Sequence, residues 1–196
     1  MHSEQIQSPP AISGVIRYFH SLLMYFTPLR KQAALNPHLG KALIQLTSFC
    51  RKRSSRLDLV TKCANIRNQC NKCLSFIRYY GNLEIQRQLI RDGLISSMIE
   101  TISTCGGCQE ERIDIIRTAL ENIINIFIDL HIGKNQSKVQ EKIVEEIFEA
   151  ENGMEEVYSN IFHSNQFKFD SVNSSAFRAK ELMIKSYIHI SNLVDS

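Results

Sequence analysis

The feature that most constrains this chain is a long stretch without proline. All four prolines lie within the first 37 residues, and none occurs from Leu39 to Ser196. Proline ends or kinks a helix because it lacks a backbone donor and clashes with the preceding turn. Turn-rich β folds, in contrast, use proline and glycine at their many turns. The sequence therefore favours long helices over a sheet.

Apolar residues recur three or four positions apart through most of the chain, the spacing that lines one face of a helix. Residues 57–80 and 113–130 show the pattern most clearly, and alternation at every second residue does not persist. This periodicity predicts an all-α protein of about eight or nine helices without a sheet. We expect a flexible N-terminal segment over residues 1–10 and a single helical repeat domain over residues 11–196.

Polar residues at predicted helix ends divide the chain into segments. Ser13 is a candidate cap for a helix over residues 14–26, and Asn36 before Pro37 suits another helix start. The pairs Asp92-Gly93 and Asn152-Gly153 each break one helix sharply before the next one begins. Because similar helical patterns surround both pairs, Gly93 and Gly153 are predicted to occupy the same place in two copies of a repeat.

These segments resemble the armadillo repeat. Residues 88–102 (QLIRDGLISSMIETI) are similar to its short first helix, glycine turn and second helix, and residues 119–123 (ALENI) to the centre of its third helix. Residues 116–162 resemble the C-terminal repeats of the importin-alpha family, with residues 176–185 as a closing helix. The resemblance implies a right-handed α-solenoid, an armadillo/HEAT-like superhelix, whose stacked helices form a groove for a partner peptide or helix.

The resemblance also implies candidate partner-binding residues. Importin-alpha holds signal peptides with a ladder of tryptophan and asparagine side chains on successive third helices. Asn122 matches the asparagine of one such helix, with Arg117 nearby, but Thr118 stands in the tryptophan position. Lys72 and Phe76 hold the two positions one repeat earlier. Because the chain contains no tryptophan, we do not expect the classical ladder to bind a signal peptide here.

Charge is distributed unevenly along the chain. Residues 1–91 contain 14 Lys/Arg and 3 Asp/Glu, whereas residues 92–196 contain 9 and 17. The densest basic cluster is Arg51, Lys52, Arg53 and Arg56. It could contact phosphates or an acidic peptide, could itself be a nuclear-import signal, or could stabilise a helix C-terminus. Seven glutamates between residues 141 and 156 could receive a basic segment or could form a solvated face.

Six cysteines raise the question of a metal or redox site: Cys50, Cys63, Cys70, Cys73, Cys105 and Cys108. Two C-x-x-C pairs have the local spacing of zinc ligands. Cys70 and Cys73, however, lie on the apolar stripe of a predicted helix, and this placement favours buried thiols. Zinc binding, or a disulfide or redox role for Cys105 and Cys108, stays open. We predict no metal and no cofactor.

The sequence carries no recognisable catalytic motif, and its six histidines are scattered. The predicted function is therefore a non-enzymatic scaffold or adaptor that binds a protein or peptide partner, in the cytoplasm or the nucleus and without membrane insertion. An importin-alpha-like transport adaptor is one form of this function. The alternatives are a nucleic-acid-binding domain that uses the basic N-terminal half, and a structural piece of a longer helical protein. The oligomeric state is left open.

Overall fold

The computed structural model describes residues 9–49, 57–103, 112–132, 138–161 and 171–194. These residues form ten α-helices and no strand, which confirms the all-α prediction. The helices are α1 (Pro9–Tyr25), α2 (Thr27–Ala34), α3 (Pro37–Thr47), α4 (Leu57–Tyr80), α5 (Leu83–Arg91), α6 (Leu94–Ile102), α7 (Ile113–Ile132), α8 (Lys138–Ala150), α9 (Gly153–Ile161) and α10 (Ser171–Val194). None of the described helices is long and apolar enough to cross a membrane.

The predicted number of helices was too low because α2 was not anticipated. Pro28 suggests a break, but it lies in the first turn of α2, where its missing N–H has no helical partner to lose. Likewise, α1 begins at Pro9 and Pro10 rather than after Ser13. The expected cap at Asn36 is confirmed, since its side-chain oxygen accepts hydrogen bonds from the backbone N–H groups of His38 and Leu39.

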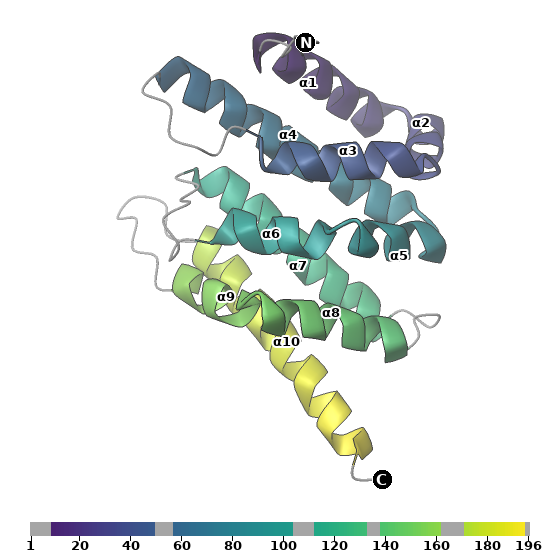
Figure 1. Ribbon diagram of the computed structural model, residues 1–196, viewed down its shortest axis with the longest axis vertical. Coiled ribbons are helices and arrows are strands. Elements are labelled where there is room, and N and C mark those ends of the chain that lie inside the picture. The colour runs from purple at the N-terminus through teal and green to yellow at the C-terminus, as the bar shows by residue number, and fades with distance from the viewer. Residues whose placement is uncertain (1–8, 50–56, 104–111, 133–137, 162–170, 195–196) are drawn as a thin grey trace, which may run out of the picture.

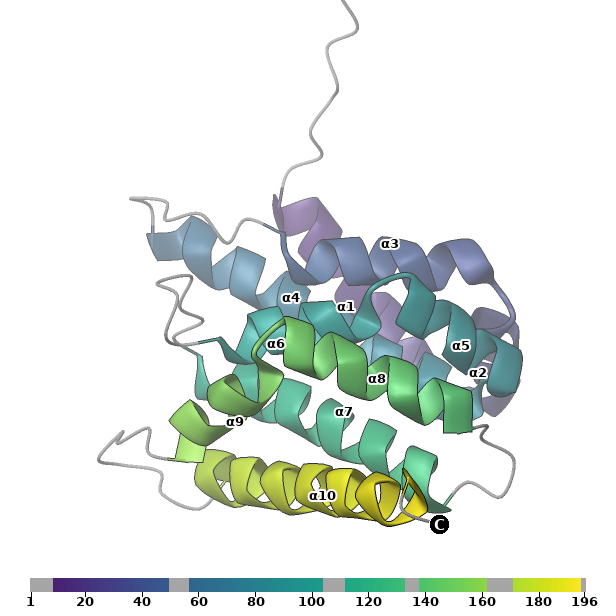
Figure 2. The same cartoon turned by 60° about the horizontal axis from the view of Figure 1, so that its bottom comes forward.

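The helices follow a recurring order of two short helices and one long helix. We call each such trio a unit: α2–α4, α5–α7 and α8–α10. The long helices α1, α4, α7 and α10 pack side by side in that order, and the short helices cover one side of this row (Figures 1 and 2). The N-terminus and the C-terminus lie at opposite ends of the molecule (Figure 1).

The core lies between the row of long helices and the layer of short helices. Helix α7 packs against α4, α6 and α10, and α4 packs against α1, α2, α3, α5 and α7. The ring of Phe127 on α7 meets the ring of Phe148 on α8 edge to face, with 5.2 Å between their centroids. Fully buried side chains of this core include Ile66, Leu74, Ile77, Ile95, Met98, Ile102, Ile116 and Phe127.

The two predicted glycine breaks are not equivalent. Gly93, between α5 and α6, has a φ of 95°, a left-handed backbone conformation that glycine adopts without strain. In the third unit the left-handed residue is Asn152, with a φ of 55°, and not Gly153. Gly153 is instead needed for space, since a Cβ atom there would lie 2.2 Å from Cδ1 of Phe148. Gly93 therefore corresponds to Asn152, which shifts the predicted match by one residue.

Side-chain hydrogen bonds join the units at a regular distance along the sequence. Asn68 of α4 donates to Asp114, 46 residues later, and Asn160 of α9 donates to the backbone carbonyl of Ile102, 58 residues earlier. Other bonds between units fall inside this range, including the bond from Asn122 to the carbonyl of Asn71, 51 residues apart. The units therefore contact one another with a nearly constant offset.

Candidate partner-binding groove

An open groove of about 540 Å³ runs across the layer of short helices. This volume lies in the range of about 300–1,000 Å³ that is usual for ligand sites. All three units contribute to it: α3 from the first, α6 from the second, and the turn between α8 and α9 from the third. The groove is lined by Ile44, Gln45, Ser48, Gly93, Ser96, Ser97, Glu100 and Glu151.

Local structure places the polar residues at the rim of the groove. Ser48 is the residue that caps the C-terminus of α3, and its hydroxyl donates to Oε2 of Glu100 on α6 at 2.8 Å. Ser96 and Glu100 share one face of α6 because they are four residues apart. The hydroxyl of Ser96 in turn donates to Oε1 of Glu151. Hydrogen bonds between neighbouring units thus hold both carboxylates at the groove.

The bond between Ser48 and Glu100 has a counterpart in the next pair of units. Ser103 caps the C-terminus of α6, as Ser48 caps that of α3. Its hydroxyl donates to Oε1 of Glu156 on α9 at 3.0 Å. The same contact, from a C-terminal serine to a glutamate on the second short helix of the next unit, therefore occurs twice. The groove is part of a repeated arrangement.

The chemistry of the groove favours a cationic ligand. Glu100 and Glu151 are exposed carboxylates, and the other polar lining groups are hydroxyls and one amide. Of the lining residues that the structure describes, none is lysine or arginine. Two of the lining residues, Ile44 and Ser97, are buried. A basic side chain lying in this groove could therefore interact with both carboxylates.

Comparison of the chain with protein-family models, curated proteins and solved structures found no match. The armadillo resemblance therefore stays an expectation from the sequence.

Asn122, the principal residue predicted to contact a partner, is buried between helices. Its side-chain amide nitrogen donates to the backbone carbonyl of Asn71 at 3.1 Å and lies 3.9 Å from the sulfur of Met98. Thr118, in the tryptophan position, is also buried, and its hydroxyl donates to the carbonyl of Asp114 at 2.8 Å. The same hydroxyl lies 3.3 Å from Oδ1 of Asn68 on α4, so both Asn122 and Thr118 contact α4.

The other predicted contact residues lie apart from one another. Arg117 is exposed on α7 and forms an ion pair with Glu121 at 3.6 Å. Lys72 and Phe76 are half-buried on α4, and the N-terminal helices cover Phe76: its ring lies 5.9 Å from that of His20 and 5.3 Å from the guanidinium carbon of Arg30. The basic cluster Arg51, Lys52, Arg53 and Arg56 lies outside the described residues.

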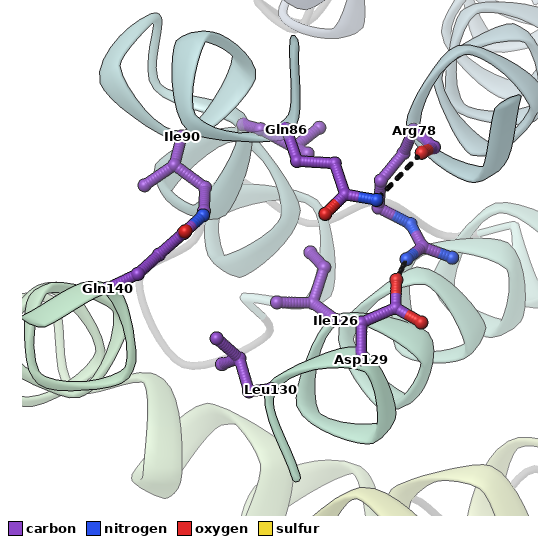
Figure 3. Close-up of a pocket in the computed structure, with 8 residues that line it drawn as sticks. Arg78, Gln86, Ile90, Ile126, Asp129, Leu130 and Gln140 are labelled. Carbon is purple, nitrogen blue, oxygen red and sulfur yellow. Dashed lines mark hydrogen bonds and ion pairs between the residues drawn. The ribbon is translucent and has the colours of Figure 1, made fainter. Parts of the chain in front are cut away.

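A small, mostly apolar cavity lies where α4, α5, α6, α7 and α8 meet (Figure 3). The centre of a water molecule can occupy a volume of about 20 Å³ inside it, so the cavity has room for one water. Arg78 and Asp129 form an ion pair in its wall, and Gln86 donates to the backbone carbonyl of Arg78. The side-chain nitrogen of Gln140 is buried without a protein partner.

The buried position of Arg78 has an electrostatic consequence. Burial lowers the pKa of its guanidinium, and the charge and hydrogen bond of Asp129 oppose that shift. Sequence reasoning missed this cavity. The available signal was the presence of Arg78, Gln86 and Gln140 beside apolar helical stripes.

The described cysteines are buried thiols, as the sequence predicted for Cys70 and Cys73. Cys63, Cys70 and Cys73 are all buried. Burial raises the pKa of Cys73 to about 12, and burial together with the neighbouring Cys73 raises the pKa of Cys70. Within the described ranges, no three His, Cys, Asp or Glu residues are grouped to hold a metal ion. Cys50, Cys105 and Cys108 lie outside those ranges.

Proposed function

We propose that this chain is a non-enzymatic scaffold or adaptor that binds an extended basic segment of a partner protein in the groove between α3 and α6. The observation that carries the proposal is the composition of the groove: residues of three successive units line it, and it presents two carboxylates. An extended peptide suits such a surface because it can contact successive units along its length.

The proposed architecture is a right-handed α-solenoid of the armadillo/HEAT type. Three features support it: the recurring order of two short helices and one long helix, the side-by-side row of long helices, and the offset of 46 to 58 residues between bonded partners. The repeated serine–glutamate contact gives a fourth. In a solenoid each repeat contacts only its neighbours, so such a constant offset is expected.

The role of a transport adaptor in the cytoplasm and nucleus belongs to the same proposal, because carried proteins often present lysine-rich and arginine-rich segments. The mode of binding would differ from that of the importin-alpha ladder, since Asn122 is buried and Thr118 replaces the tryptophan. Recognition would instead come from Glu100 and Glu151.

The test is a fluorescence anisotropy titration with a labelled 12-residue peptide that alternates lysine and serine. The variant Glu100→Gln/Glu151→Gln removes both groove carboxylates while keeping their shape. We expect it to weaken binding about tenfold, which corresponds to about 1.4 kcal/mol. The matched control, Glu146→Gln/Glu155→Gln, removes two exposed glutamates that do not line the groove and should change affinity less than about twofold.

Two results would overturn the proposal. Equal weakening in both double variants would mean that the peptide is attracted only by net negative charge. Tighter binding of a labelled single-stranded oligonucleotide, with affinity falling steeply as salt rises, would instead favour the nucleic-acid alternative and the basic cluster at residues 51–56.

A further inference from the structure

Exposed large apolar side chains gather at the two ends of the row of long helices. At the N-terminal end they include Val15, Tyr18, Met24 and Tyr25 of α1, with Phe26 and Leu35 close by in sequence. At the C-terminal end they are Ile143 of α8 and Phe177 and Ile184 of α10. In the part of the chain that the structure describes, none lies on α5, α6, α7 or α9. Of the two long helices that lie between neighbours, α7 exposes none of these side chains in its described part, and α4 exposes Val60 and Tyr79.

Helix α1 carries two parallel apolar seams. One seam, Ile12, Ile16, Phe19 and Leu23, packs against the core. The other contains Val15, Tyr18 and Tyr25, and its tyrosines are 67% and 78% exposed. Arg17 is the only Lys, Arg, Asp or Glu in the 17 residues of α1. A helix that is apolar on nearly all sides is normally enclosed on more than one side.

Helix α10 leaves a complementary face open at the other end. It packs against α7 and α9 through buried Val172, Ala176, Ala179 and Met183. Phe177 and Ile184, seven residues apart on another face, are 50% and 36% exposed. Because α1 packs along α4 as α10 packs along α7, the free faces of α1 and α10 are the two open ends of one row of helices (Figure 1).

The N-terminal and C-terminal ends of the row of helices carry opposite net charge. Residues 9–49 contain Arg17, Arg30, Lys31 and Lys41 and no acidic residue. Residues 138–161 and 171–194, which contain α8 to α10, hold eight glutamates and five Lys/Arg; three of these Lys/Arg, Arg178, Lys180 and Lys185, lie on α10. Opposite charges on the two ends attract the N-terminal end of one copy to the C-terminal end of another, and they disfavour contact between like ends.

We propose that the chain self-associates head to tail, with the free face of α1 of one copy packed against the α8–α10 end of a second copy. This contact is heterologous, so each copy keeps one open end and the assembly lengthens as concentration rises. The proposal does not depend on the ligand of the groove.

The exposed area indicates a weak contact. An aromatic side chain buries about 150–250 Å², so Tyr18 and Tyr25 together expose roughly 300 Å². A standard interface takes about 800 Å² from each partner. We therefore expect a dissociation constant on the order of 10–100 µM, lower at low salt.

The experiment is sedimentation velocity of the full chain from about 5 to 500 µM, a range that brackets this dissociation constant. Wild type should sediment faster as concentration rises, and less so at high salt. Tyr18→Glu and Phe177→Glu each place a charge on one end, and each variant alone should stay monomeric. Val60→Glu, on an exposed side chain of α4, should behave as wild type. If Tyr18→Glu does not fold, as judged by circular dichroism, Val15→Glu takes its place.

Mixing Tyr18→Glu with Phe177→Glu tests whether the contact is head to tail. Each retains the end that the other has lost, so an equimolar mixture should form dimers but nothing longer. A mixture that stays monomeric would overturn the proposal, as would a wild type that is monomeric throughout the range. Association that Phe177→Glu leaves unchanged would also overturn it, because it would indicate a symmetric contact between two α1 helices.

Discussion

Asn122 of α7 donates a hydrogen bond from its side-chain amide to the backbone carbonyl of Asn71 in α4, a residue 51 positions earlier in the chain. Both residues are buried. This bond ties the long helices of two consecutive units together at the middle of their contact. An asparagine that the sequence match offered as a partner-binding residue therefore stabilises the stack itself.

Removing this bond should destabilise the fold. We expect Asn122→Ala to lower the free energy of unfolding by about 1–3 kcal/mol, because it deletes a buried donor and leaves a small cavity. Arg117→Ala, an exposed change on the same helix, should cost less than about 0.5 kcal/mol. Urea unfolding followed by circular dichroism measures both. Equal stability of the two variants would show that the bond contributes nothing.

The ion pair between Arg78 and Asp129 should contribute more to the stability of the fold than an ion pair on the surface. Asp129→Ala leaves the buried guanidinium of Arg78 without its carboxylate and should lower the free energy of unfolding by about 2 kcal/mol. The loss should be smaller than for a fully enclosed ion pair, because Asp129 is partly exposed. Glu84→Ala breaks an exposed pair with Arg91 and should leave the unfolding temperature nearly unchanged. Thermal unfolding of the two variants measures the difference. If Glu84→Ala lowered the unfolding temperature more than Asp129→Ala, the buried placement of Arg78 would be contradicted.

The two glycines should respond differently to alanine. The added Cβ atom of Gly93→Ala meets no atom within 4 Å. The only cost should therefore be the strain of alanine in a left-handed backbone conformation, about 1–2 kcal/mol in the free energy of unfolding. Asparagine tolerates this conformation better, so Gly93→Asn should cost less than Gly93→Ala. Gly153→Ala must displace the buried ring of Phe148 and should cost about 2–3 kcal/mol. Chemical denaturation measures the free energy of unfolding of all three variants. A Gly153→Ala variant as stable as wild type would contradict the close contact between residue 153 and Phe148.

The buried thiols should react slowly in the folded protein. Pulsed alkylation at pH 8, read by peptide mass spectrometry, should modify Cys63, Cys70 and Cys73 at least roughly a hundredfold more slowly in the folded chain than in urea. Fast labelling of Cys70 in the folded chain would contradict its burial.

The same thiols give the fold a pH dependence. The folded state holds the pKa of Cys73 at about 12, above the ordinary value of 9.0. Below about pH 9 the thiol is neutral in both states, and its contribution to stability is fully present. Above about pH 9 the unfolded chain ionises first, so the free energy of unfolding should fall as pH rises toward 12. In Cys70→Ala/Cys73→Ala this fall should be smaller, and an unchanged slope would rule out these thiols as its source.

Much of the fold follows from local signals. The apolar period, the absence of proline after Pro37 and the cap at Asn36 place most of the helices. The pattern did not reveal α2, because Pro28 is compatible with both a break and a helix start. The offset between Gly93 and Asn152 was also hidden, since two different residues can supply a left-handed turn.

The candidate groove was harder to predict because it depends on contacts between distant residues. Glu151 belongs to the acidic stretch noticed in the sequence, but Ser48 and Glu100 are 52 residues apart and meet only when units stack. The burial of the matched asparagine, Asn122, was hidden for a related reason. A short motif indicates a residue type but not the rotation of its helix, and the rotation of α7 directs Asn122 toward Asn71.

The most direct test of the central claim is to locate a bound basic peptide on the chain. A lysine–serine peptide carrying a photoreactive group can be cross-linked to the protein and the modified residues identified by mass spectrometry. The account predicts cross-links to α3, α6 and the turn between α8 and α9, with loss of these products in Glu100→Gln/Glu151→Gln. Cross-links confined to the exposed face of the long helices, around Arg117, would contradict it and would place the binding surface on the opposite layer.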